Sequence, residues 1–114
     1  MERKYDLEER TFNFAKNCRL YVKSLSTTIA NIEDGRQLIR SSGSVGANYI
    51  EANEKLGSRD FQFRIKIAKK EAKESGYWLR LLKEANPNEE MVQSLIDESL
   101  ELRKILSSIL KKTQ

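Results

Sequence analysis

The sequence contains no histidine and a single cysteine among its 114 residues. The absence of imidazole excludes His-containing catalytic triads, imidazole general bases and His-dependent zinc sites. One cysteine, Cys18, allows no intrachain disulfide, which fits a reducing compartment. Cys18 falls on the apolar stripe of the first expected helix, so we interpret it as a small core residue rather than a nucleophile. We therefore expect no enzyme activity, no catalytic residues, no metal site and no cofactor.

Proline occurs once and glycine five times, while 39% of residues are hydrophobic and 33% are charged. This composition is typical of a helical bundle rather than a β-protein, and the length suits one domain with one core. No run of 18 apolar residues exists, so we expect no transmembrane helix. Residues 1–12 lack the apolar run of a secretory signal. We expect a soluble cytoplasmic protein with no membrane partner.

Apolar residues recur at helical spacing in four stretches. We expect helices at about residues 6–25, 33–56, 59–84 and 89–112, with Ser58 and Asn88 as N-caps of the last two. Ile29 and Ile32 are expected to pack beneath the first connection. The clearest stripe, on the third helix, comprises Phe61, Ile65, Ala68, Ala72, Ser75, Leu79 and Leu82. Four helices with short connections predict an all-α fold, an up-down antiparallel four-helix bundle forming a single domain over residues 1–114.

The second expected helix is unusually rich in small residues around Gly43 and Gly46. Each internal glycine costs about 1 kcal/mol of helix stability relative to alanine, so something must compensate. Close packing of two helix backbones is one explanation. The other is a helix end or kink that exposes amides to a phosphate, but no strand precedes these glycines and no phosphate-loop spacing is present. We favour close packing.

Apolar residues exceed what a monomeric bundle needs in two places. The last helix carries two adjoining stripes, and Tyr77, Trp78 and Leu81 lie partly outside the stripe of the third helix. The two stripes consist of Met91, Leu95, Leu102, Ile105 and Ile109, and of Val92, Ile96, Leu106 and Leu110. Such a surplus predicts a homo-oligomer, and the alternative is a thicker core.

Glutamates are spaced one turn apart at Glu71 and Glu74, and again at Glu51 and Glu54. Facing carboxylates of this kind build di-iron sites in helical bundles, but those sites use a Glu-x-x-His motif and this chain has no histidine. Ion pairs with Arg36, Arg40 and Arg64 explain these acids better.

Lysine and arginine outnumber aspartate and glutamate by 21 to 17, which gives a net charge of +4. Basic residues recur at helical spacing on the expected solvent side of the third helix, together with one tyrosine. The candidate nucleic-acid contacts are Arg59, Lys66, Lys70, Lys73, Tyr77 and Arg80. Such a stripe neutralises phosphates, and a tyrosine offers a stacking surface for an unpaired base. The alternative is a solvated face with i,i+4 pairs such as Lys70 with Glu74.

The segments RSSGSVGANYIEA at residues 40–52 and EAKESGYWLRLL at residues 71–82 carry a resemblance. In combination they resemble the four-helix-bundle proteins encoded within intervening sequences of bacterial 23S rRNA genes. The resemblance implies a ring, a homopentamer, with no catalytic residues to carry over. A more distant likeness is to the accessory protein of diversity-generating retroelements, which binds nucleic acid and a reverse transcriptase.

The resemblance also implies a structural polar network in which Arg40 or Asn48 pairs with glutamates of a neighbouring helix. Its members are Arg40, Asn48, Glu51, Glu71 and Glu74. The leading hypothesis is a non-enzymatic oligomeric accessory protein that binds RNA or another nucleic acid through the basic stripe. The alternative is a scaffold or adaptor that binds another protein and no nucleic acid.

Overall fold

The structure, a computed structural model, describes residues 3–54 and 56–113, with side chains from residue 7 onward. It contains four helices, α1 (Arg3–Ser24), α2 (Ile29–Ala52), α3 (Ser58–Ala85) and α4 (Met91–Lys112), and the described residues form no strand. The 28 residues of α3 correspond to about 42 Å at 1.5 Å per residue. Because the molecule measures 44 Å along its longest axis, α3 runs nearly its full length. The all-α, four-helix prediction is confirmed.

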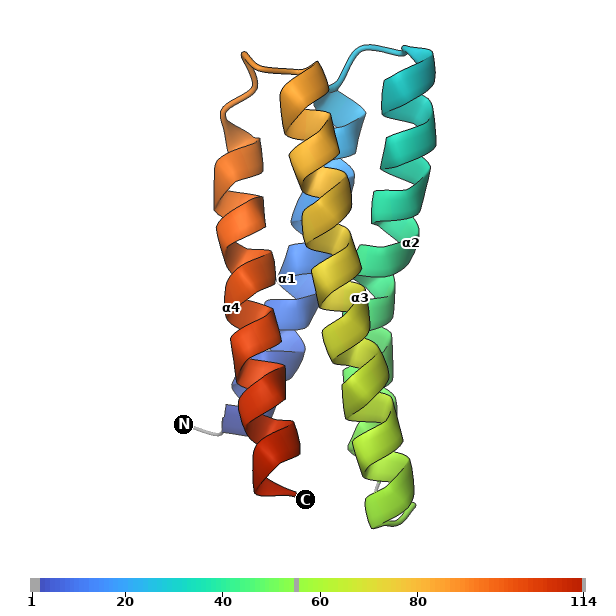
Figure 1. Ribbon diagram of the computed structural model, residues 1–114, viewed down its shortest axis with the longest axis vertical. Coiled ribbons are helices and arrows are strands. Elements are labelled where there is room, and N and C mark those ends of the chain that lie inside the picture. Colours follow the sequence, from blue (N-terminus) through green and yellow to red (C-terminus); the bar gives the residue numbers. More distant parts are fainter. Residues whose placement is uncertain (1–2, 55, 114) are drawn as a thin grey trace.

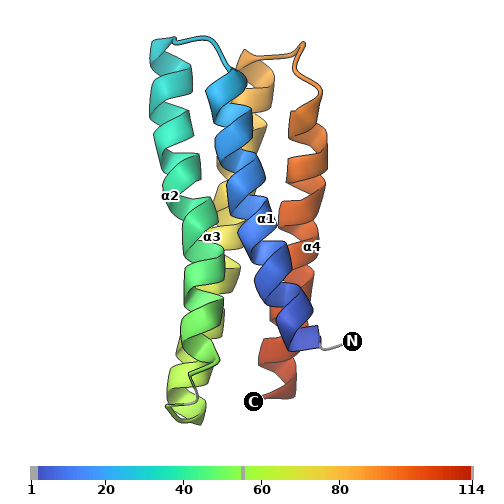
Figure 2. The same cartoon turned by 180° about the vertical axis from the view of Figure 1, so that it is seen from behind.

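Consecutive helices are joined at alternate ends of the bundle (Figures 1 and 2). Each helix packs on its neighbours in sequence, and α1 also packs on α4, which closes the bundle. The α1–α2 and α3–α4 connections meet at one end, where Asn31 and Asn86 exchange two side-chain hydrogen bonds of 3.0 and 2.8 Å. These amide contacts tie the two connections together.

The first turn of α2 begins four residues earlier than the sequence suggested. Thr28 accepts a hydrogen bond of 3.1 Å from the backbone amide of Asn31 and so caps the helix there. As a result Ile29 and Ile32 lie on the outer side of the helix, with 83% and 43% of their surface exposed. The expectation that these isoleucines pack beneath the connection is wrong.

The expected caps of α3 and α4 are also wrong. Ser58 is the first helical residue of α3, and the cap is Gly57. The φ of Gly57 is +123°, a backbone angle that residues with a side chain rarely adopt. For α4 the cap position is Glu90, two residues beyond Asn88. Neither helix start has a side-chain capping hydrogen bond.

The core lies along the stripe predicted on α3. Six of its seven residues are buried and Phe61 is partly buried against them. On α4 the core includes all four residues of the second apolar stripe and Leu95 and Leu102 of the first, leaving Ile105 and Ile109 half-buried and Met91 exposed. The thicker-core alternative therefore accounts for most of the apolar surplus of α4.

Small residues on α2 allow α1 to approach closely. A Cβ atom on Gly35 would stand 2.9 Å from a methyl carbon of Val22, and one on Gly46 would stand 2.9 Å from the hydroxyl of Thr11. The helix continues unbroken through Gly43 and Gly46. Close packing, rather than a phosphate-binding break, therefore explains Gly35 and Gly46.

Candidate nucleic-acid interface

The basic face of α3, defined as Arg59, Lys66, Lys70, Lys73, Tyr77 and Arg80, is fully accessible. All six side chains are exposed, and they lie on the side of α3 opposite its buried stripe. Tyr77 has 54% of its surface exposed and packs edge-on against Trp78, with ring centroids 5.0 Å apart. The basic face therefore presents an aromatic ring between cations of the same helix.

The lysines of the basic face are not paired with acids. Within the described part of the chain, Lys66, Lys70 and Lys73 form no ion pair, so the expected pair of Lys70 with Glu74 is not formed. The reason is that Glu74 is bound elsewhere, by Arg40 of α2 and by the indole of Trp78. The ammonium groups of the basic face are available to a ligand.

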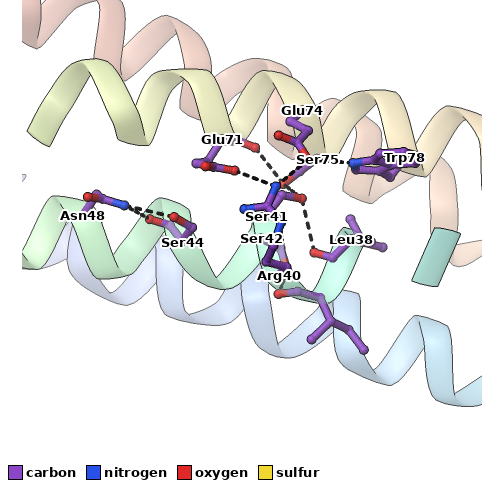
Figure 3. A network of polar contacts seen from close by, with 11 residues as sticks. Leu38, Arg40, Ser41, Ser42, Ser44, Asn48, Glu71, Glu74, Ser75 and Trp78 are labelled. Carbon is purple, nitrogen blue, oxygen red and sulfur yellow. Dashed lines mark hydrogen bonds and ion pairs between the residues drawn. The ribbon is translucent and has the colours of Figure 1, made fainter. Parts of the chain in front are cut away.

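Arg40 connects α2 to α3 through two carboxylates (Figure 3). Its Nη2 donates hydrogen bonds of 3.3 Å to Glu71 and 2.5 Å to Glu74. Glu71 is 7% exposed, so its charge lies at the edge of the core and the guanidinium compensates it. The hydrogen bonds that Arg40 donates to Glu74 and Glu71 raise the pKa of Arg40.

Glu74 also accepts a hydrogen bond of 2.9 Å from Trp78 Nε1. Burial acts to raise the pKa of Glu74, but hydrogen bonds from Trp78 and Arg40 outweigh burial and leave that pKa below its usual value. Next to this carboxylate, the buried hydroxyl of Ser75 lies 2.9 Å from that of Ser41. Polar contacts therefore fix the register of α2 against α3.

Two predicted members of the polar network lie apart from these contacts. Asn48 donates to the backbone and side chain of Ser44 and accepts a hydrogen bond of 3.3 Å from Arg64, so its partners include no glutamate. Glu51 is exposed and forms no hydrogen bond or ion pair through its side chain with any described residue. Its position on the outer side of α2 explains this separation from Glu71 and Glu74.

A groove between α3 and α4 was not anticipated from the sequence. It consists of two cavities, of about 780 and 230 Å³, that share Leu100 and Arg103. The basic residues that line this α3–α4 groove are Lys69, Lys73, Arg80, Arg103, Lys104 and Lys111. The available signal was the pair Arg103 and Lys104, followed about two turns later by Lys111 on α4.

The described residues contain no group of three or more His, Cys, Asp or Glu side chains that could hold a metal ion. None of the four helices is long and apolar enough to cross a membrane, as far as the structure describes them.

Comparison with known proteins agrees with the fold. The family model of the 23S rRNA-intervening sequence protein matches residues 3–108. A crystal structure of a protein of unknown function, from the S23 ribosomal protein family of Bacteroides thetaiotaomicron, is 30% identical and superposes with a TM-score of 0.83. The match covers 96% of this chain and 99% of that one. No curated protein matches the chain. The resemblance carried by residues 40–52 and 71–82 is thus confirmed, and the chain belongs to the 23S rRNA-intervening sequence protein family.

Proposed function

We propose that this protein is a non-enzymatic, oligomeric accessory protein that binds RNA or another nucleic acid through the basic face of α3. The observation that carries the proposal is the accessibility of six aligned side chains whose central lysines form no ion pair with any described acid. Unpaired ammonium groups displace the counterions of a phosphate backbone, which is the main source of affinity for nucleic acids. The exposed ring of Tyr77 supplies a surface on which an unpaired base stacks.

A charge-reversal experiment tests the basic face. Lys66→Glu, Lys70→Glu and Lys73→Glu together should abolish binding of a structured RNA while leaving the helical circular dichroism spectrum unchanged. The matched comparison is the double variant Lys66→Glu/Lys70→Glu against Lys16→Glu/Lys23→Glu, because all four lysines are exposed and the net charge changes equally. Equal affinities for these two double variants would remove the basic face from the proposal.

We infer that the helices form an antiparallel up-and-down bundle and that copies of it assemble into a ring, a homopentamer. The alternating connections support the first inference. Exposed apolar side chains on α1 and α3 support the second, because surfaces of this kind are commonly buried between subunits. These side chains include Phe12, Leu20, Phe63 and Leu81. Repetition of the basic face around a ring would multiply its field.

Multiwavelength sedimentation velocity on nuclease-treated protein tests assembly and binding together. The protein boundary gives the oligomeric state, and RNA absorbance in the same boundary gives binding. A pentamer-sized particle that carries RNA and releases it as salt rises supports both inferences. A monomer contradicts the ring, and a ring that never carries RNA contradicts nucleic-acid binding.

The composition, with one cysteine and no disulfide, supports the cytoplasm as the site of action.

A second candidate function is that of a scaffold for another protein, and one feature favours it. Near the α1–α2 connection lies a hollow of about 370 Å³ whose lining includes Val22, Leu25, Ile32 and Ile39. A partner bound there should remain with the protein after nuclease treatment and should be lost from an Ile32→Glu variant. Retention by that variant would count against the hollow as a docking site.

A further inference from the structure

The α3–α4 groove is lined by residues between 69 and 80 of α3 and between 96 and 111 of α4. Its two cavities share Leu100 and Arg103, so they adjoin each other. Within the described chain, side-chain hydrogen bonds between the α3 and α4 segments occur near the two ends, from Gln62 to the carbonyl of Thr113 and from Lys83 to Gln93. The two cavities lie between these contacts.

Small side chains shape the floor of the groove. Gly76 lies so near Ser99 that a Cβ atom on the glycine would stand 2.9 Å from the serine hydroxyl. The hydroxyl groups of Ser107 and Ser108 line the same depression further along α4. Ile96, Leu100 and Leu110 also line the two cavities, so small and apolar side chains together form the floor of the groove.

The rim of the groove is positively charged. Its two cavities are lined by six cations and by no described aspartate or glutamate. Lys104 is within 3.8 Å of Glu101, and the other five cations form no hydrogen bond or ion pair with the described residues. Five positive charges without counter-charges give this surface a positive potential, so the groove is suited to a polyanion.

The basic face and the groove meet at three side chains. Lys73, Tyr77 and Arg80 belong to the basic face and also line the smaller cavity. An aromatic ring between two cations at the edge of a basic groove is the combination used by proteins that bind single-stranded nucleic acid, where the groove follows the backbone and the ring stacks on a base.

We propose that the α3–α4 groove binds the sugar-phosphate backbone of single-stranded nucleic acid, with a base stacked on Tyr77. This inference rests on the proposed function and specifies its ligand as a single strand. Arg103, Lys104 and Lys111 of α4 then contact phosphates together with Lys69 and Lys73 of α3. The strand lies along the bundle axis.

The test compares two triple variants that remove equal charge. The groove variant is Lys69→Gln/Arg103→Gln/Lys111→Gln, and the outer variant is Arg59→Gln/Lys66→Gln/Lys70→Gln. The probes are a fluorescent oligouridylate and an RNA hairpin duplex, measured by anisotropy over a range of salt concentrations. Thermal melting of both proteins verifies that each retains the wild-type fold.

We expect the groove variant to bind the oligouridylate at least about tenfold more weakly and to lose about 2 from the slope of log affinity against log salt, since each single-strand phosphate contact contributes about 0.7. The outer variant should lose less. The wild type should bind the oligouridylate more tightly than the duplex. If the outer variant loses as much as or more than the groove variant, or if the duplex binds more tightly, the groove inference is wrong while nucleic-acid binding stands. If the wild type binds neither probe, the proposed function itself is wrong.

Discussion

Gly46 of α2 packs against Thr11 of α1 with no space for a side chain, because a Cβ atom on the glycine would stand 2.9 Å from the threonine hydroxyl. Gly46→Ala should therefore lower the free energy of unfolding by about 1–3 kcal/mol, the usual cost of overpacking a tight interface. This loss is expected although alanine has the higher helix propensity by about 1 kcal/mol. Urea denaturation followed by circular dichroism measures the change.

Gly43→Ala is the matched control on the same helix. There the nearest atom to a new Cβ is a terminal nitrogen of Arg19, at 3.1 Å, which moves easily because it ends a flexible side chain. We expect this variant to be as stable as the wild type or more stable by up to about 1 kcal/mol. If both alanine variants were stabilised alike, the close approach of α1 to α2 at Gly46 would be incorrect.

The periodicity of the sequence predicted the helices and their buried faces, because burial of one face repeats at short range along the chain. It failed at the start of α2, where the capping hydrogen bond from Asn31 to Thr28 set the helix boundary four residues earlier. The small residues of α2 indicated close packing, but only the structure identifies Thr11 and Val22 of α1 as the opposing side chains.

Ala72 lies in the centre of the α3 stripe and has no exposed surface. Ala72→Glu should destabilise the protein by about 3–5 kcal/mol, because an unpaired carboxylate would be buried. Ala47→Glu introduces the same side chain at an exposed position of α2 and should change the stability little. The melting temperatures of the two variants, measured side by side, check this expectation, and equal temperatures would show that the register of α3 is misassigned.

The pKa of Glu74 is lowered in the folded protein, so its ionised form stabilises the fold. That contribution to stability is fully present at pH values above 4.5, the usual pKa of a glutamate. It is lost as the pH falls through the lower pKa that Glu74 has in the folded state. Glu74→Gln should therefore cost about 1–2 kcal/mol at neutral pH and progressively less at acidic pH. Urea unfolding of wild type and variant at a series of pH values gives the two curves. A difference that stays constant down to the acid limit would contradict the role of the ionised carboxylate.

Part of the candidate interface was predictable from the sequence and part was not. The residues of the basic face recur at helical spacing along α3, so the sequence alone indicated that they lie on one side of this helix. The α3–α4 groove depends on how Lys69 and Lys73 of α3 lie relative to Arg103 and Lys111 of α4, which is set by packing between helices. Packing between helices also decides the position of Glu51. Its spacing from Glu54 equals that of Glu71 from Glu74, but Glu51 lies on the exposed side of α2.

Cys18 is fully buried, and burial raises the pKa of its thiol to about 12. Because the thiolate is the reactive form, iodoacetamide should modify the native protein at neutral pH only through transient opening, and modification should be rapid in denaturing urea. The control is a Cys18→Ala/Ser94→Cys variant, whose new thiol lies at an exposed position of α4 and should react at once. Mass spectrometry over time distinguishes the two proteins. If Cys18 reacted as fast as the exposed thiol, it would not be the core residue that its place on the α1 stripe indicates.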